Sequence, residues 1–175
     1  MRLAARSIAI LAGTLLALGS SACSPSEQGV ETVHTDDPAI VLSEGECDQT
    51  CPVYDMTLKP DGSYLLNGVR FVKTPGVSDG GLGTDAWAAA EEALGAANFW
   101  MLEPNQTSST KPDCVPGTPT AAVTWRTAEG KQKTLNYRAG CGGPEGRALI
   151  PALRAAMQFD QLVWSEDRFA PDGSR

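Results

Sequence analysis

The sequence predicts an α+β domain in which an antiparallel sheet of about five strands carries two helices packed on one face. The expected order of elements is β-β-β-α-β-β-α. Two observations predict it: segments with a two-residue hydrophobic period are joined by hairpin turns, and each group of strands is followed by a segment with a helical period. Because helices do not alternate with single strands, the sheet is expected to be antiparallel rather than parallel.

The first group contains three expected strands. Residues 39–44 and 52–59 are the first two, and apolar side chains recur at every second position of the latter. The sequence PDGS follows, in which Pro fixes φ and Asp-Gly supplies the positive φ of a tight turn. The chain then returns through YLLNGVRFVK, so residues 51–73 are expected to form a hairpin or meander.

A glycine-rich run, GVSDGGLG at residues 76–83, is expected to be a loop that leads into a helix. It lacks the GxxxxGK of a Walker loop and the GxGxxG of a dinucleotide loop, so a phosphate-binding loop is excluded. Thr84 is the expected cap of the helix, and the helix dipole favours an acidic residue such as Asp85 in the first turn. The core face of this helix is expected to contain Trp87, Ala90, Leu94 and Ala97.

The second half of the chain repeats this pattern. Residues 104–119, rich in Pro, Ser and Thr, have no period and are expected to be a loop. Residues 120–127 and 131–138 flank an AEG turn and predict a second hairpin. Residues 144–159 predict the second helix, whose inward side chains would be Leu149, Leu153, Ala156 and Met157.

The first 22 residues predict an export signal of the lipoprotein type. Arg2 and Arg6 precede a short apolar core, and small residues then lead to Cys23. This junction resembles the bacterial lipobox, in which the cysteine after the cleavage site carries the lipid, although Ser20 stands where Leu is usual. Cleavage by ordinary signal peptidase is the alternative, but it would leave an unpaired thiol in an oxidising compartment, which favours lipidation of Cys23.

Residues 23–37 are then expected to be a flexible tether, residues 38–165 a single domain, and residues 166–175 a polar tail. The chain has 14 Lys and Arg against 21 Asp and Glu. Removal of the signal takes away two arginines and no acid, which leaves 12 against 21 and a formal charge of −9. No basic cluster is present, so nucleic acid is excluded as a partner. The expected partners are the membrane, through the lipid on Cys23, and a protein or envelope polymer.

Several segments together resemble a bacterial domain of unknown function, number 6438. They are CPVYDMTLKPDGSYLLNG, the FW after the first expected helix, TAAVTW and PALRAAM, and the resemblance extends from about Ile40 to Trp164. Its most specific part is formed by Cys51, Pro52, Tyr54, Asp61 and Gly62. The resemblance implies an exported or lipid-anchored protein, and it transfers no catalytic residue and no ligand.

Cys47 and Cys51 have a CxxxC spacing that allows three interpretations. A thioredoxin-type redox pair requires CxxC at a helix start, whereas Cys51 opens a strand. CDQTCP is similar to the CxxxCP of copper-delivery proteins of the Sco type, but their third ligand is a downstream histidine, and the only histidine here is His34 in the expected tether. With Cys23 set aside, four cysteines remain in an oxidising compartment, which favours disulfides.

Four cysteines allow three connectivities. Cys47 and Cys51 can meet if the residues between them turn, while Cys114 and Cys141 flank a hairpin whose pairing brings its ends together. The favoured connectivity is therefore Cys47 with Cys51 and Cys114 with Cys141. The second pair closes the longer loop and is expected to stabilise the fold by roughly 3 to 4 kcal/mol, and the first by less.

The sequence does not predict an enzyme or a cofactor. With its histidine in the tether, the domain cannot build a Ser-His or Cys-His pair, and its adjacent carboxylates would point apart. The expected function is a membrane-tethered envelope lipoprotein that acts as a non-catalytic binding or accessory module, with contacts from residues 76–83 and 104–119. The alternative is an envelope copper or zinc protein that uses Cys47 and Cys51. The expected location is the periplasmic face of a membrane, with the outer membrane favoured because Ser24 is not the Asp of inner-membrane retention.

Overall fold

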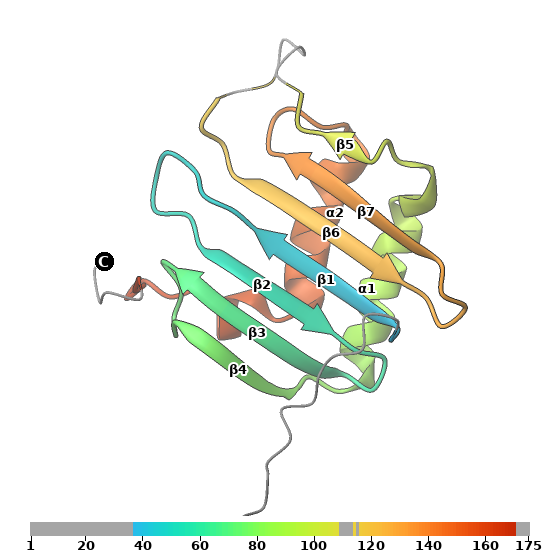
Figure 1. The fold of residues 1–175 in the computed structure, drawn as a ribbon, viewed down its shortest axis with the longest axis horizontal. Coiled ribbons are helices and arrows are strands. Elements are labelled where there is room, and N and C mark those ends of the chain that lie inside the picture. The colour runs from blue at the N-terminus through green and yellow to red at the C-terminus, as the bar shows by residue number, and fades with distance from the viewer. Residues whose placement is uncertain (1–36, 109–113, 115, 171–175) are drawn as a thin grey trace, which may run out of the picture. The chain divides into compact units, whose positions relative to one another are not determined.

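Seven strands form one sheet in the spatial order β4-β3-β2-β1-β6-β7-β5 (Figure 1). The strands come from a computed structural model that describes residues 37–108, 114 and 116–170. Neighbouring strands are antiparallel, except that β5 runs parallel to β7. The first strand of the described chain therefore lies at the centre of the sheet.

The elements follow one another along the chain as β1 (Ala39–Glu44), β2 (Val53–Leu58), β3 (Ser63–Arg70), β4 (Gly76–Gly81), α1 (Thr84–Ala96), the 3-10 turn η1 (Phe99–Met101), β5 (Asn105–Gln106), β6 (Thr120–Arg126), β7 (Gln132–Arg138), α2 (Pro144–Ala156) and α3 (Phe159–Leu162).

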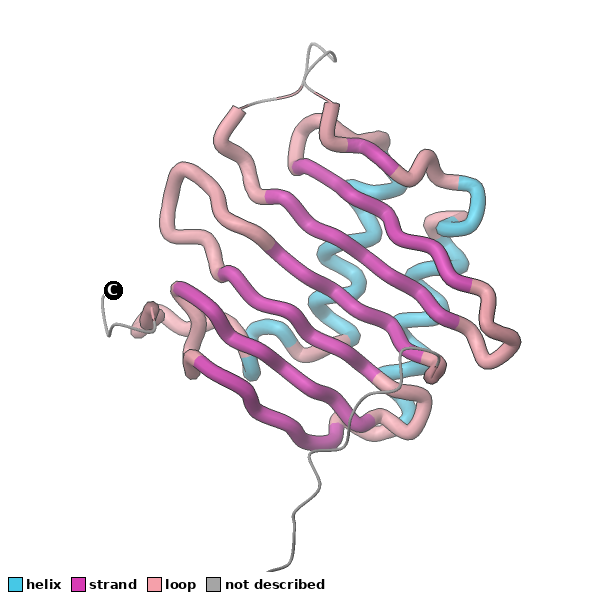
Figure 2. Tube along the Cα trace, viewed as in Figure 1, coloured by secondary structure: helices cyan, strands magenta, loops and turns pink. Residues whose placement is uncertain are grey.

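The helices α1 and α2 cover the same face of the sheet, behind the strands in Figures 1 and 2. Alternate side chains of each strand turn toward them. On β2, Tyr54, Met56 and Leu58 are buried, whereas Asp55 between them is exposed. Leu94 of α1 and Leu153 of α2 are fully buried against this face. The core therefore lies between one sheet face and two helices.

α1 begins directly after Gly83, whose positive φ of 82° turns the chain into the helix. Thr84 is the first helical residue and no side chain caps the helix, so the predicted Thr84 cap is wrong. Trp87, expected in the core, is only partly buried. The buried residues of α1 recur at every fourth position and are Ala86, Ala90 and Leu94.

α2 begins at Pro144, whose ring suits the first helical turn, where its missing N–H needs no partner. Leu149, Leu153 and, just after the helix, Met157 are buried, as the helical period predicts. Pro151 lies inside the helix and removes one main-chain hydrogen bond, because it has no N–H to donate.

The glycine-rich run expected to be a loop is instead the edge strand β4. It pairs with β3 in continuous register from Ser63 opposite Gly81 to Gly68 opposite Gly76. Three of its six residues are glycine, which has no side chain to show a hydrophobic period, so no strand pattern is visible in the sequence here. Gly80 also has a packing role, because a Cβ at this position would lie 2.9 Å from Cε1 of Tyr64.

The stretch expected to be an unbroken loop before the second hairpin contains β5, which is two residues long and parallel to β7. So short a strand has no readable period. The prediction of an antiparallel sheet of about five strands in the order β-β-β-α-β-β-α is therefore wrong: the sheet has seven strands and is mixed, and η1 and α3 accompany the two expected helices.

Beyond α3 the chain returns to the sheet. Phe169 forms an antiparallel bridge with Val72, in which the N–H of Phe169 donates to the carbonyl of Val72 at 2.9 Å. Ala170 is buried there. None of the helices in the described ranges has the length and apolar character needed to cross a membrane.

Candidate functional site

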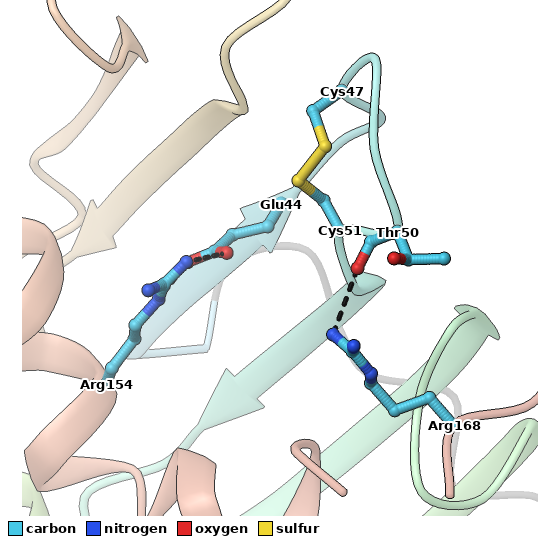
Figure 3. A network of polar contacts seen from close by, with 6 residues as sticks. All are labelled: Glu44, Cys47, Thr50, Cys51, Arg154 and Arg168. Carbon is cyan, nitrogen blue, oxygen red and sulfur yellow. Dashed lines mark hydrogen bonds and ion pairs between the residues drawn. A yellow bond between two sulfur atoms is a disulfide. The ribbon is translucent and has the colours of Figure 1, made fainter. Parts of the chain in front are cut away.

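The connection between β1 and β2 is a short loop closed by a disulfide between Cys47 and Cys51 (Figure 3). Their Cα atoms are 5.8 Å apart, and the N–H of Cys51 donates to the carbonyl of Gln49 at 3.0 Å. Nη1 of Arg168 donates to the carbonyl of Thr50 at 3.0 Å, which ties the loop to the segment after α3. Because the two sulfurs are bonded to each other, the pair offers no thiolate to a metal ion in this state.

A second disulfide joins Cys114, before β6, to Cys141, in the turn after β7. Both pairs are those favoured from the sequence, and the prediction of disulfides is confirmed. Cys23, the predicted lipid site, and His34 lie outside the described residues. In the part of the chain that the structure describes, no group of three or more His, Cys, Asp or Glu side chains could hold a metal ion.

Glu44 is the last residue of β1, and the strand period turns its side chain to the core face together with Leu42. Its exposed fraction is 4%, and no other acidic residue among those described is buried. Arg154 of α2 meets it across the core (Figure 3): Nε donates to Oε1 at 2.6 Å, and Nη2 donates to Oε2. The two parallel hydrogen bonds satisfy both carboxylate oxygens, so the buried charge has a full partner.

Tyr54 lies opposite Glu44 in the β1–β2 pairing and is buried beside the ion pair. Its hydroxyl lies outside hydrogen-bond geometry with its neighbours. Burial, and then the Glu44 carboxylate, raise the pKa of Tyr54 far above its ordinary value of 10.0. The hydrogen bonds with Glu44 raise the pKa of Arg154 as well. Both groups therefore keep their protons at physiological pH, and they form a fixed arrangement of charge rather than a proton-transfer pair.

A cavity of about 360 Å³ lies between α2 and the neighbouring ends of β6 and β7. The side chains that line it from α2 are Arg147, Ile150, Pro151 and Arg154. Their spacing of three and four residues places them on one stripe of the helix. The facing wall includes Pro119, Ala121 and Tyr137, and Glu44 closes the inner end. The cavity thus joins the buried ion pair to the surface along an apolar wall.

The charges around this cavity do not cancel. Glu44 offsets the charge of Arg154, whereas Arg147 is exposed and pairs with no carboxylate in the described ranges. Among the residues that the structure describes, the Arg147 guanidinium is therefore uncompensated, in a protein that has 21 acidic against 14 basic side chains. An arginine in this position can hold a negatively charged group through charge-assisted hydrogen bonds, and the apolar wall reduces competition from water.

Another hollow, of about 380 Å³, lies at the sheet and is lined by Ser43, Asn105, Asn136 and neighbouring Thr and Ala residues. It contains no charged side chain. Neutral polar side chains on an open surface select a ligand less strongly than a buried ion pair and a free guanidinium do. We therefore take the α2 cavity, lined by Glu44, Arg147 and Arg154, as the candidate binding site.

Sequence reasoning did not single out these three residues. One signal was present: Glu44 follows Ile40 and Leu42 at the inward positions of a strand, where an acid requires a buried partner. The spacing of Arg147 and Arg154, seven residues apart on a helix, was a second and weaker signal. The pairing itself spans 110 residues, and no local pattern predicts it.

The family model described as Domain of unknown function (DUF6438) matches residues 38–156. The matched range runs from the start of β1 to the end of α2, so it contains both disulfides and every residue of the cavity. No curated protein matches the chain.

Proposed function

The chain belongs to the family of the domain of unknown function DUF6438, and from its own geometry we propose that it is an exported, membrane-tethered binding module without catalytic activity. The α2 cavity is its ligand site, and Arg147 receives an acidic group of the ligand. The observation that carries this proposal is the uncompensated guanidinium of Arg147 beside an apolar wall and a neutralised ion pair.

Two observations support export. Two disulfides are compatible with an exported or extracellular protein, since such bonds persist in oxidising compartments. The first 22 residues have the charge and apolar pattern of an export signal, and Cys23 directly follows them. The lipid anchor on Cys23 and the location in the cell envelope follow from this pattern, and they belong to the proposal.

The groups around the cavity support binding rather than catalysis. Arg154 and Tyr54 keep their protons at physiological pH, and Glu44 is held by two hydrogen bonds from Arg154. A general base must be free to accept a proton from a substrate. Metal handling by Cys47 and Cys51 would need their disulfide to be reduced first, so the structure does not favour this alternative function.

The tether is tested by intact mass. The protein is purified from bacterial membranes without reductant and with a thiol-alkylating agent present. We expect a mass that begins at Cys23, includes acyl chains and lacks two pairs of hydrogens. An unacylated protein would contradict the tether. Alkylation of Cys47 and Cys51 would show that they are free thiols, and metal handling would then be the preferred function.

The ligand site is tested by titration of the isotope-labelled protein with acetate and inorganic phosphate, followed by nuclear magnetic resonance. Ala121, Ala139 and Gly140 line the cavity, so we expect their amide signals to shift with the anions and not with acetamide, which is neutral and close in shape to acetate. The variant Arg147→Gln should lose the response, whereas Arg70→Gln should keep it, because Arg70 lies on β3 and pairs with Glu46. Equal shifts with acetamide and acetate would contradict the proposal.

A further inference from the structure

The shape and wall of the α2 cavity restrict its ligand more narrowly than charge alone does. We infer that the ligand is a small carboxylate with an apolar body, an aliphatic or aromatic acid that carries a single negative charge. This inference rests on the proposed function, because it describes the occupant of the same site.

The single charge follows from the arginines. Arg154 gives two hydrogen bonds to Glu44, so its charge is already compensated inside the protein. A second anionic group placed beside Arg154 would face the Glu44 carboxylate and be repelled by it. Arg147 is exposed and has no carboxylate partner among the described residues. The cavity therefore provides for one anion, and Arg147 is the residue that binds it.

The apolar body follows from what lies between the two arginines. Arg147 and Arg154 are two helical turns apart, which separates their Cα atoms by roughly 10 Å along the axis. Ile150 and Pro151 occupy the stripe between them, and Ala121 lies on the facing wall. A ligand whose acid group binds Arg147 would extend over carbon atoms toward the inner end. Such surface offers few hydrogen bonds to water, and covering it is favourable.

The small size follows from the volume. Ligand pockets in proteins commonly have volumes of about 300–1,000 Å³. At about 360 Å³ this cavity lies near the lower limit, so it suits a short aliphatic chain or a single ring. Tyr137 and the buried Glu44 close its inner end, and a longer chain would have to leave the cavity.

The inference is tested with acetate, butanoate, hexanoate and octanoate, and with hexanol as the neutral control, by the same resonance titration of the mature protein in micelles. Each added methylene should tighten binding by up to about fourfold until the cavity is filled. Hexanol should bind more weakly than hexanoate by about tenfold, the loss expected when a charge-assisted hydrogen bond is missing. Because the shifts of Ala121, Ala139 and Gly140 are local, uptake of the acids by the micelles does not imitate them.

Two variants separate the acid group from the apolar body. Arg147→Gln should weaken hexanoate binding about tenfold and leave hexanol binding unchanged. Ala139 lines the same cavity, so Ala139→Leu fills part of the space that the body would occupy. It should keep the acetate response, read from the Ala121 amide, and abolish the gain from acetate to hexanoate. An unchanged spectrum away from the cavity verifies that each variant is folded, and Arg70→Gln serves as the matched control.

Two results would overturn the inference while the proposed function stands: equal affinities for acetate and hexanoate, or a gain with chain length that Ala139→Leu leaves intact. Equal binding of hexanol and hexanoate would also overturn it, because the cavity would then not select a charge. A cavity that responds to no anion at all would overturn the proposed function together with the inference.

Discussion

Glu44 occupies a position on β1 where the strand period places an apolar side chain, after Ile40 and Leu42. Removal of a carboxylate from water is costly unless the group is paired and fully hydrogen-bonded. Arg154 provides two hydrogen bonds from the opposite side of the core. The buried Glu44 carboxylate is therefore tolerated because Arg154 compensates it, and the loss of either partner leaves the other without that compensation, fully buried for Glu44 and partly buried for Arg154.

We expect Glu44→Ala to lower the free energy of unfolding by about 3 kcal/mol, because the Arg154 guanidinium would remain partly buried without its carboxylate. Urea unfolding followed by circular dichroism measures this loss. The matched control is Glu46→Ala, which breaks a pair with Arg70 at 3.2 Å that is largely exposed. Exposed pairs contribute less than about 1 kcal/mol. Equal losses in the two variants would contradict the assignment of Glu44 and Arg154 as a buried pair.

Asp61 in the turn between β2 and β3 is expected to make stability depend on pH. Its Oδ1 accepts hydrogen bonds from the Ser63 hydroxyl at 2.7 Å and from the Ser63 N–H at 2.9 Å. These bonds lower the pKa of Asp61 below its ordinary value of 3.8. The carboxylate therefore stabilises the fold above pH 3.8, and this contribution is lost as the pH falls through the lowered pKa.

Urea midpoints measured between neutral and strongly acidic pH test this. Asp61→Asn should flatten the acid limb of the curve relative to the unmodified protein. Ser63→Ala removes the hydroxyl donor and keeps the N–H donor, so it should flatten the limb only in part. Identical acid limbs in all three proteins would show that this turn does not contribute to the pH dependence.

Gly142, next to the second disulfide, has no room for a side chain, whereas Gly95 in α1 faces open space. A Cβ on Gly142 would lie 2.1 Å from Cε2 of Tyr137 and 2.7 Å from Oε1 of Gln106, inside the packed end of the sheet. Gly95 of α1 has no atom within 4 Å of the same position. The first glycine permits close approach between two elements, and the second only adds flexibility to the unfolded chain.

We therefore expect Gly142→Ala to destabilise the protein by about 1–3 kcal/mol through steric overlap, and Gly95→Ala to stabilise it by about 0.5–1 kcal/mol through a lower entropy of the unfolded chain. Thermal and urea unfolding of the two variants measure both changes. A neutral Gly142→Ala would mean that the Tyr137 ring can move away without loss.

The two disulfides are expected to contribute unequally. Cys114 and Cys141 are 27 residues apart and Cys47 and Cys51 only four, so the former pair restricts the unfolded chain more. Replacement of both Cys114 and Cys141 by Ala should cost about 3.5 kcal/mol, and replacement of both Cys47 and Cys51 about 2 kcal/mol. Urea unfolding of the two double variants without reductant checks the order, and a larger loss at Cys47 and Cys51 would contradict it.

Elements with a side-chain period could be predicted from the sequence, and elements without one could not. Alternation gave β2 and β6, and the helical period gave α2 with its buried Leu149 and Leu153. Three of the six residues of β4 are glycine and β5 has only two residues, so their pairing is visible only in main-chain hydrogen bonds. The Cys114–Cys141 pair followed from hairpin geometry, and the Cys47–Cys51 pair from the short segment between the two cysteines, which can turn. The binding site did not, because Glu44 and Arg154 meet only after the sheet and α2 have assembled.

The central strand β1 has one neighbour that lies close to it in the sequence, β2, and one that lies far from it, β6. β1 pairs with β2 in five positions on one side and with β6 in six positions on the other. The first described strand is thus completed only by a strand that follows more than 70 residues later, and α1 and α2 contact each other across the same core. Neither half of the chain can bury the apolar face of β1 alone.

This arrangement predicts that the two halves of the sheet open together. In native-state hydrogen exchange, the most protected amides of the β1–β2 and β1–β6 ladders should report one common free energy of opening, because exposure of either ladder requires global unfolding. Amides of β4 should exchange through smaller openings, since this exposed glycine-rich strand has a neighbour on one side only. Exchange of the β6 amides at a distinctly lower free energy than those of β2 would mean that β6, β7 and α2 unfold as a separate unit. The candidate ligand site, which α2, β6 and β7 form together with Glu44 of β1, would then open without loss of the remaining fold.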